Sequence, residues 1–390
     1  MEMRHLRIKD YDELLEMLNS VFARKYGRAM DFLNEQPRMW VRDDEHMRKH
    51  IGIFDGDRLC SVVGVYPLRA SICGIPMLFA TTGNVATRPE YEGRGYFTAL
   101  FNEAMAEAER MGVQAARLGG ARQRYGRYGF EPCGTSYNFT VTHETRVKFF
   151  DNRETKIDFE EIAPTDAAVL LACREMRARR EINVERGDVG DVYRSLTTKH
   201  CAPYAARIGG ETVGYLSAYN DGQFVGRSEN GRHIAEICAK DTNTLVAMIC
   251  GWQERVGSAI TLSLPPYMTE AVRLMCDCAQ ETTVVSPSMF RVLDFIRLTD
   301  ALMKLKAKCG WLDNGECVIE IEGRGRMRLF AREENAGCER TDAVPDLTLT
   351  VSKATRLLYG HLPADAVANV PPILRLWLPL PLSWDGLDYV

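Results

Sequence analysis

The sequence lacks an excess of charge of either sign, a long apolar run and a secretory signal, and each absence excludes a class of protein. Its 49 Lys and Arg against 53 Asp and Glu give a net charge of −4, without the basic excess typical of nucleic-acid-binding domains. No stretch reaches the roughly 20 uncharged apolar residues of a membrane span. The longest, residues 370–382, contains Arg375 and several prolines. The charged residues of the first few positions predict no signal peptide.

The 12 cysteines lack the paired spacing of zinc sites, since only Cys276 and Cys278 lie close together. Free thiols in a chain of this length are typical of a reducing compartment, so we expect a cytoplasmic protein without a bound metal. At 26% charged and 46% apolar residues, the composition is that of a folded globular protein. A single core rarely grows past ~250–300 residues, so a chain of 390 predicts several domains.

Apolar periodicity predicts a first unit over residues 1–150, in the order strand, helix, three strands, helix, strand. Asp10 and Glu13 have the spacing of a capping box at the start of the first helix. A second helix over 96–111 ends at Gly112. This order is typical of a mixed sheet flanked by helices.

Residues 151–292 repeat a similar order of predicted strands and helices and are interpreted as a diverged copy of the first unit. No glycine-rich turn follows the strand that ends at Ala239, so the copy is expected to have lost its ligand loop. Residues 293–390 form a third unit of helices and strands that ends on the apolar, proline-rich segment 370–382. We expect this segment to pack internally.

The segment 84–97 is the most informative in the chain. A strand runs into the turn Glu92-Gly93-Arg94-Gly95, and the turn opens a helix at Tyr96. Backbone N–H groups and a helix N-terminus that converge in this way can hold a phosphate or pyrophosphate. No Gly-Lys-Ser/Thr follows, which excludes a P-loop, and the third glycine of a dinucleotide fingerprint is absent.

This turn resembles the coenzyme A loop of the GNAT acetyltransferase superfamily, with Gly95 at the first conserved glycine. Glu92 stands where that family has Arg or Gln, and Phe97 where it has Gly or Ala. A second stretch, 125–132 (Tyr-Gly-Arg-Tyr-Gly-Phe-Glu-Pro), is similar almost residue for residue to the enhanced intracellular survival (Eis) acetyltransferases.

The Eis resemblance covers essentially the whole chain and implies its domain organisation. It implies a mixed α/β (α+β) fold with a catalytic GNAT domain over 1–150 and a degenerate second GNAT-like domain over 151–292. A sterol-carrier-protein-like domain over 293–390 would follow and supply the C-terminal carboxylate. By the same analogy the protein forms a homo-oligomer, a hexamer.

The resemblance also implies an N-acetyltransferase that uses acetyl-coenzyme A (acetyl-CoA) as co-substrate. Val85, Ala86 and Thr87 would offer strand backbone to its pantetheine arm. The pyrophosphate would be cradled by the main chain of Glu92, Gly93, Arg94, Gly95 and Tyr96. Tyr125 matches the general acid of the family, and the carboxylate of Val390 matches its general base. The implied acceptor is an aminoglycoside-like polyamine or a lysine amine, with no nucleic-acid or membrane partner.

The chemistry of acyl transfer from a thioester to an amine requires a base, an acid and donors to an oxyanion. An attacking amine must lose a proton, and a departing thiolate gains from a donor such as a phenol. An oxyanion needs N–H donors, which a strand can supply. Trp40 is either a wall of the acceptor pocket or a half-buried anchor. Asp388 either attracts a cationic acceptor or solvates the chain end.

Two alternatives stay open. In the first, the chain is a binding protein for a lipid or small molecule and its acetyltransferase domain is a relic, which the departures at Glu92 and Phe97 favour. In the second, the transferred acyl chain is longer than acetyl, and only the pocket beside residues 85–87 differs.

Overall fold

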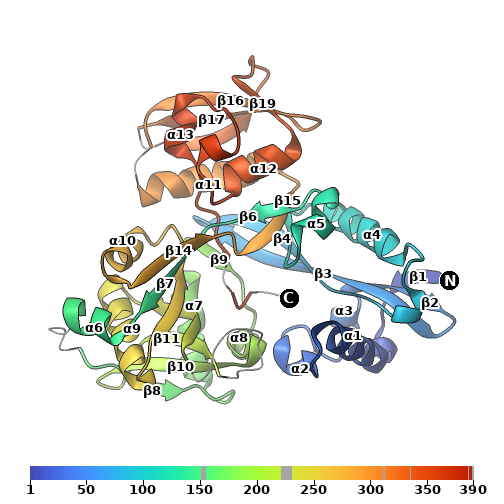
Figure 1. The fold of residues 1–390 in the computed structure, drawn as a ribbon, viewed down its shortest axis with the longest axis horizontal. Helices are drawn as coiled ribbons and strands as arrows, with labels where there is room; N and C mark the ends of the chain where they lie inside the picture. Colours follow the sequence, from blue (N-terminus) through green and yellow to red (C-terminus); the bar gives the residue numbers. More distant parts are fainter. Residues whose placement is uncertain (151–154, 221–230, 311, 334, 385, 389–390) are drawn as a thin grey trace.

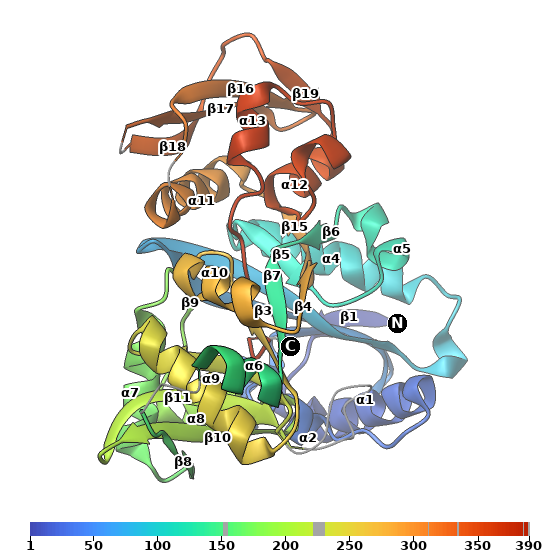
Figure 2. The ribbon, with the colours of Figure 1, turned by 60° about the vertical axis from the view of Figure 1, so that its left-hand side comes forward.

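Three β-sheets of eight, seven and four strands organise the part of the chain that the structure describes. The computed structural model describes residues 1–150, 155–220, 231–310, 312–333, 335–384 and 386–388. The two larger sheets lie side by side, and the four-stranded sheet with its helices lies above both of them (Figures 1 and 2). The mixed α/β architecture of tandem sheets with flanking helices, expected from the sequence, is confirmed.

The first sheet positions the candidate site. Its strands in spatial order are β1 (Glu2–His5), β2 (His50–Asp55), β3 (Arg58–Ile72), β4 (Ile75–Thr87), β5 (Ala115–Leu118), β15 (Ser288–Val292) and β6 (Glu131–Cys133), with β9 (Ile182–Val184) paired to β3. The helices around it are α1 (Tyr11–Tyr26), α2 (Phe32–Glu35), α3 (Asp44–Met47), α4 (Tyr96–Arg110) and α5 (Arg122–Tyr125), with 3-10 turns at Ile8–Asp10, Pro89–Tyr91 and Gly126–Tyr128.

Helices α1 and α4 cover opposite faces of this sheet (Figure 1). The apolar stripe of α4, with Leu100 and Phe101, packs on Val63 and Val65. On the other face, Leu14 and its neighbours in α1 pack on the residues of β3 that alternate with these. Since successive strand residues point to opposite faces, one strand serves both helices.

The second sheet repeats the strand order of the first. Its strands in spatial order are β8 (Asp158–Glu161), β10 (Cys201–Ile208), β11 (Glu211–Tyr219), β12 (His233–Ala239), β13 (Ile260–Leu264), β7 (Ser136–Val141) and β14 (Glu281–Val285). Its helices are α6 (His143–Phe150), α7 (Ala167–Ala178), α8 (Val189–Leu196), α9 (Thr242–Val256) and α10 (Thr269–Cys278), with a 3-10 turn, η4, at Thr198–His200. The order β8-β10-β11-β12-β13 matches β1-β2-β3-β4-β5, as expected of a diverged copy.

Strands β7 and β15 each pair in the sheet of the other unit (Figure 2), and β9 of the second unit also pairs with β3 of the first sheet. Strand β7 follows the first unit's strands in the sequence but pairs with β13 and β14 of the second sheet. Strand β15 follows the second unit's strands but pairs with β5 and β6, at the equivalent position of the first sheet. Sheet membership therefore crosses the expected boundaries, since β7 precedes residue 150 and β15 precedes residue 293. The boundaries themselves stay predictions.

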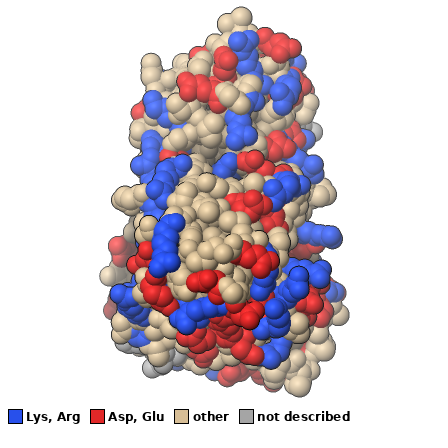
Figure 3. All heavy atoms as spheres, turned by 90° about the vertical axis from the view of Figure 1, so that its right-hand side faces the viewer, with Lys and Arg blue, Asp and Glu red and all other residues tan. Residues whose placement is uncertain are grey.

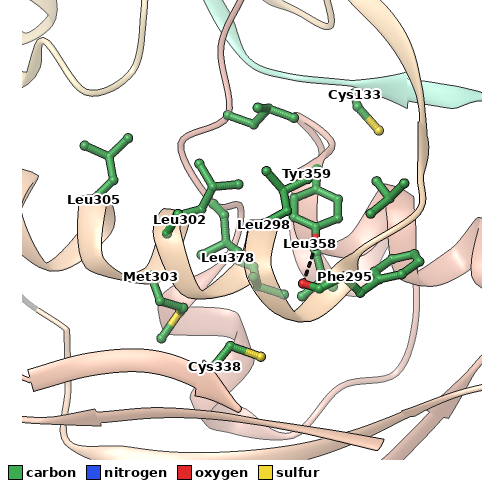
Figure 4. Packing of buried hydrophobic residues seen from close by; sticks show 14 of the residues in the cluster. Cys133, Phe295, Leu298, Leu302, Met303, Leu305, Cys338, Leu358, Tyr359 and Leu378 are labelled. Atoms are coloured by element: carbon green, nitrogen blue, oxygen red, sulfur yellow. Dashed lines mark hydrogen bonds between the residues drawn. The ribbon is translucent and has the colours of Figure 1, made fainter. Parts of the chain in front are cut away.

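The third unit packs on the far end of the first sheet. Its sheet has the order β18 (Asn335–Arg340), β17 (Gly325–Arg332), β16 (Gly315–Ile321) and β19 (Leu347–Leu349), and its helices are α11 (Phe295–Cys309), α12 (Val351–Tyr359) and α13 (Pro372–Trp377), with a 3-10 turn at Ala364–Ala366. In Figure 4 the ring of Tyr359 lies beside Leu298 of α11, and its hydroxyl donates to the Phe295 carbonyl (3.4 Å). The likeness of this unit to sterol carrier proteins stays a prediction.

The apolar tail packs internally, as predicted. Trp377, Leu380 and Leu382 are fully buried in the core that joins the third unit to the first sheet. Trp384 then lies against Phe79 of β4, with ring centroids 5.1 Å apart. The tail therefore runs from the third unit back to the strand that carries the candidate site.

Candidate active site

Strands β4 and β5 are parallel and hydrogen-bonded to each other over only part of their length. The candidate site lies where this pairing ends. They pair from Phe79 opposite Ala115 to Thr81 opposite Arg117. Strand β4 then continues to Thr87 while β5 ends at Leu118. The backbone of β4 beyond Thr81 is therefore without a β5 partner, and its polar groups are available to a ligand.

A β-bulge lies on this part of β4. Asn84 and Val85 together face the single residue Val63 of β3, and Asn84 has a positive φ of 51°. Its side-chain NH₂ donates to the Tyr66 hydroxyl (2.7 Å), which in turn contacts His50 Nε2 (2.7 Å). Burial lowers the pKa of His50 to about 4, so at neutral pH the uncharged ring accepts from Tyr66. This buried chain fixes the bulge, a device that re-aims a strand at an active site.

A first cavity of about 550 Å³ follows the outer part of β4; we call it the cofactor cavity. The backbone-offering residues predicted for the pantetheine arm, Val85, Ala86 and Thr87, all line it, as does Glu92. Its other lining includes a set of cations that suits the phosphates of a coenzyme, namely Arg24, Lys25, Arg124 and Arg127.

The predicted phosphate loop borders the cofactor cavity between Glu92 and Phe97. Gly93 and Gly95 have φ of 75° and 79°, in the left-handed region that favours glycine. No side chain caps helix α4 and its first turn holds no acidic residue, so its leading N–H groups face outward. The Arg94 side chain instead turns back on the loop and donates to the Glu90 carbonyl (3.2 Å). Arg94 is thereby engaged within the loop, and the main-chain N–H groups are the donors that the loop offers to a ligand.

Replacing Gly95 by Ala is expected to raise the KM for acetyl-CoA about tenfold. The added Cβ would occupy the open space through which the pyrophosphate of the coenzyme would approach the main chain of the loop. Gly112→Ala at the other end of α4 is the matched control. Gly112 also has a positive φ (70°), and neither added Cβ meets an atom within 4 Å, so both variants carry the same backbone cost of ~1–2 kcal/mol. Steady-state kinetics at saturating acceptor measure both. Equal KM values for the two variants would exclude the loop from coenzyme binding.

A second cavity, of about 640 Å³, joins the first along a shared edge formed by Phe22, Lys25, Val85 and Arg124. We call it the acceptor cavity. Asn84 and Tyr125 line it from the first unit, and Thr198 and Lys199 line it from the second. A ligand in the cofactor cavity would therefore present its far end at Val85, where the acceptor cavity begins.

Tyr125 is buried, with 8% of its surface exposed. Its ring packs against Phe101 (centroids 5.4 Å apart) and Phe97 (6.2 Å). A Cβ added to Gly120 would lie 2.5 Å from the ring, so glycine is required there. Burial raises the pKa of Tyr125 while the charge of Arg124 opposes the shift, and the hydroxyl stays protonated at neutral pH. A protonated phenol that lines this cavity is able to donate a proton to a ligand there.

Trp40 does not line either cavity. It is 8% exposed and packs among Tyr11 and Phe32, with ring centroids 5.7 and 6.3 Å away. Since Phe32 lines the acceptor cavity, Trp40 supports that wall from behind. Both expectations for Trp40, direct wall and half-buried anchor, are thereby corrected to a core residue.

Asp388 is also placed differently from both expectations, because its side chain is 0% exposed. Its carboxylate is held by Arg177 and Arg186 and lies 3.7 Å from Arg38. A carboxylate enclosed by three guanidinium groups neither solvates a chain end nor faces a cationic acceptor. Val390 lies outside the described residues.

The tail nevertheless passes beside the acceptor cavity. The Lys199 ammonium, which lines that cavity, donates to the Gly386 carbonyl (3.4 Å). Arg117 of β5 and Trp384 both donate to the carbonyl of Asp388 (3.4 and 3.2 Å). The chain is therefore fixed at Asp388 between the two larger units.

Sequence reasoning missed the bulge with its Tyr66–His50 support and the contribution of Thr198 and Lys199. Asn84 was a usable signal, because Asn is depleted in strand interiors and tolerates a positive φ. Within the described residues no group of His, Cys, Asp and Glu could hold a metal ion. None of the helices described is both long and apolar enough to cross a membrane.

Known proteins resemble this chain in sequence over its first third and in fold throughout. Residues 2–133 match the family model Acetyltransf_9, an acetyltransferase (GNAT) domain. No curated protein sequence matches the chain. A GCN5-related N-acetyltransferase from Kribbella flavida has a TM-score of 0.66 at 18% identity, with both chains covered over 100%. One from Anabaena variabilis has 0.68 at 14%, again with 100% of both chains covered.

Eis1 from Mycobacterium abscessus is similar over 99% of both chains, with a TM-score of 0.65 at 16% identity. At such identities the likeness concerns the fold. Residues 2–133 thus match a GNAT acetyltransferase domain, and the chain as a whole has the fold of these solved N-acetyltransferase structures.

Proposed function

We propose that the protein transfers an acetyl group from acetyl-CoA to an amine. The observation that carries the proposal is the meeting of the two cavities at Val85, beside the buried hydroxyl-bearing ring of Tyr125. One cavity suits a phosphorylated, elongated donor and the other a small acceptor. The GNAT domain match over residues 2–133 supports acetyl-CoA as that donor.

The donor would be held mainly by backbone. The edge of β4 at residues 85–87 pairs with the pantetheine amides, and the loop 92–96 with the open end of α4 takes the pyrophosphate. Arg124 and Arg127 add charge to the cavity. Main-chain N–H groups at the bulge serve as donors to the thioester oxygen as it gains negative charge.

In the chemical step, the amine nitrogen attacks the thioester carbonyl carbon and forms the C–N bond. The C–S bond then breaks, and Tyr125 gives its proton to the departing sulfur. The amine proton passes to the general base, which we propose is the carboxylate of Val390. Its support is the tail beside the acceptor cavity, fixed at Asp388 just before the last residues. The proton returns to Tyr125 through solvent.

The test is a thiol-release assay with acetyl-CoA across amines that include an aminoglycoside and a lysine peptide. We expect acetyl-dependent release of coenzyme A. The rival, a binding protein with a relic domain, expects no release and no thermal shift with acetyl-CoA. A true ligand at a hundredfold over its Kd stabilises the fold by ~2.7 kcal/mol. Absence of both signals would end the proposal. The hexamer and the cytoplasmic location stay predictions.

A further inference from the structure

The helix that carries Tyr125 is too short to be stable by itself. Helix α5 spans only Arg122–Tyr125, and the 3-10 turn Gly126–Tyr128 follows it directly. A single helical turn is not stable alone in water, because too few hydrogen bonds form to offset the ordering of its backbone. The position of Tyr125 therefore depends on contacts that α5 makes with other parts of the chain.

One such contact holds the first residue of α5. Arg122 donates to both carboxylate oxygens of Glu131 on β6, from Nε to Oε2 (2.6 Å) and from Nη2 to Oε1 (3.1 Å). A bidentate pair fixes the orientation of the guanidinium as well as its distance. Tyr125 is the last residue of the same turn, and the rings of Phe97 and Phe101 pack on it. The turn is therefore held at both of its ends.

The acceptor of this bidentate pair is buried. The Glu131 side chain is 4% exposed, whereas that of Arg122 is 51% exposed. Burial opposes ionisation of Glu131, but hydrogen bonds from Arg122 and Ser352 outweigh it and lower its pKa, so the carboxylate is charged at neutral pH. Figure 3 shows acidic and basic side chains interspersed over one face of the molecule, and pairs between exposed side chains contribute little. A buried carboxylate is costly to leave unpaired, so the guanidinium stays with it.

The third unit binds the same carboxylate. The hydroxyl of Ser352, in the first turn of α12, donates to Oε1 of Glu131. Helix α12 packs beside β6 (Figure 2). The N–H of Gly134, just after that strand, donates to the carbonyl of Tyr359 at the end of α12 (2.7 Å). A continuous series of hydrogen bonds therefore runs from α12 through Glu131 to α5.

We propose that Glu131 is a positioning residue for acetyl transfer, which holds Arg122 and thereby the turn of α5, so that the Tyr125 hydroxyl meets the departing sulfur. This inference rests on the proposed function, since it takes Tyr125 as the acid. It gives the third unit a second role beside carrying the tail. A general acid works only within hydrogen-bond reach of its target, and a displacement of about 1 Å can cost roughly 100-fold in rate.

Glu131→Gln tests the proposal, because it keeps the size of the side chain but replaces one acceptor oxygen of the bidentate pair by an NH₂ group. The half-exposed Arg122 guanidinium can then turn to water without becoming a buried unpaired charge. We expect kcat for acetyl transfer to fall about tenfold and the KM for acetyl-CoA to change less than about twofold. Ser352→Ala should lower kcat by a smaller factor, about threefold.

Asp10→Asn is the matched control. Asp10 is also a buried carboxylate, 5% exposed, and it accepts two hydrogen bonds from Arg4 (2.7 and 3.0 Å). Arg4 belongs to β1, at the opposite edge of the first sheet from β6. Thermal melts should show a loss of stability in both variants, because each loses a charged partner of a buried pair. Only Asp10→Asn should keep kcat within about twofold of wild type.

The Tyr125→Phe protein separates positioning from a general loss of structure. If Glu131 acts through the Tyr125 hydroxyl, Glu131→Gln should lower kcat about tenfold in the wild type and less than about twofold in Tyr125→Phe. A merely structural role would give the same factor in both backgrounds. Hydrogen exchange of residues 122–130, measured by mass spectrometry, is a second readout. We expect faster exchange in Glu131→Gln than in Asp10→Asn, because the N–H groups of Tyr125 and Phe130 close this turn.

Three results would overturn the inference and leave the proposed function standing. They are a kcat in Glu131→Gln within twofold of wild type, an equal fall of kcat in both backgrounds, and equal exchange in Glu131→Gln and Asp10→Asn. Failure of the proposed function looks different, since the wild type would then release no coenzyme A with any amine and calorimetry would detect no binding of coenzyme A. The inference would fall with it.

Discussion

Replacing Tyr125 by Phe is expected to lower kcat for acetyl transfer by about 100-fold or more, while the KM for acetyl-CoA changes by less than about twofold. A positioned general acid contributes roughly 10²–10⁴ in rate. Phe keeps the ring contacts with Phe101 and Phe97, so the loss isolates the hydroxyl. Steady-state thiol release with a responding amine measures both constants.

The pH dependence provides a second readout for Tyr125. Because burial raises the pKa of this phenol, its proton stays available above the ordinary phenol value. Wild-type kcat should therefore not fall through loss of this proton between about pH 6 and 9. A kcat in the Tyr125→Phe protein within threefold of wild type would remove the residue from the mechanism.

Two adjacent glycines provide a test of Tyr125 that leaves the tyrosine itself in place. Gly119 and Gly120 both line the acceptor cavity. A Cβ on Gly120 lies 2.5 Å from the Tyr125 ring, whereas a Cβ on Gly119 meets nothing within 4 Å. We expect Gly120→Ala to displace the ring and to lower kcat at least tenfold, and Gly119→Ala to stay near wild type. Equal activity of the two variants would contradict a position-sensitive role for the ring.

Local patterns predicted the parts of the site that depend on neighbours in sequence. The turn at Gly93 and Gly95 and the helix after it were readable because positive φ and an uncapped helix start are encoded within a few residues. Tyr125 was found through the motif around it. The role of residues 85–87 came from the resemblance to the GNAT acetyltransferases.

The rest of the site depends on contacts between distant residues, which spacing does not encode. The pairing of β7 and β15 in each other's sheets is one example. Both sheets have an equivalent position for a short apolar strand, next to β5 in the first sheet and next to β13 in the second. The capping box at Asp10 and Glu13 was wrong for the same reason. Asp10 accepts from Arg4 of β1 (2.7 Å), and Glu13 accepts from the N–H of Leu59 on β3 (2.6 Å).

The C-terminal tail carries the other prediction with a large expected effect. Adding one glycine after Val390 should lower kcat about 100-fold or more, because the carboxylate moves by one residue and an amide that cannot accept a proton takes its place. Val390→Ala keeps the carboxylate at the same position and should stay within a few-fold of wild type. Thiol-release kinetics on both proteins measure the difference. Equal rates in the two would eliminate the terminal base.

Asp388→Asn separates the anchoring of the tail from its chemistry. The Asp388 carboxylate is enclosed by Arg177 and Arg186, which also bind the buried Glu236. Removing one partner of a buried ion pair costs about 3–5 kcal/mol, because the other charges stay buried. We expect a matching fall in the free energy of unfolding together with a loss of kcat, measured by urea denaturation and thiol release.

The two tail variants together identify what the ion cluster does. The added glycine should lower kcat without changing stability, because it leaves Asp388 and its arginines in place, whereas Asp388→Asn should lower both. If Asp388→Asn lost stability but kept full activity, the cluster would serve only to join the two units, and the base would have to come from elsewhere. We expect Asp388→Asn to lower both stability and kcat, since Asp388 is buried, contacts both larger units and lies two residues before Val390.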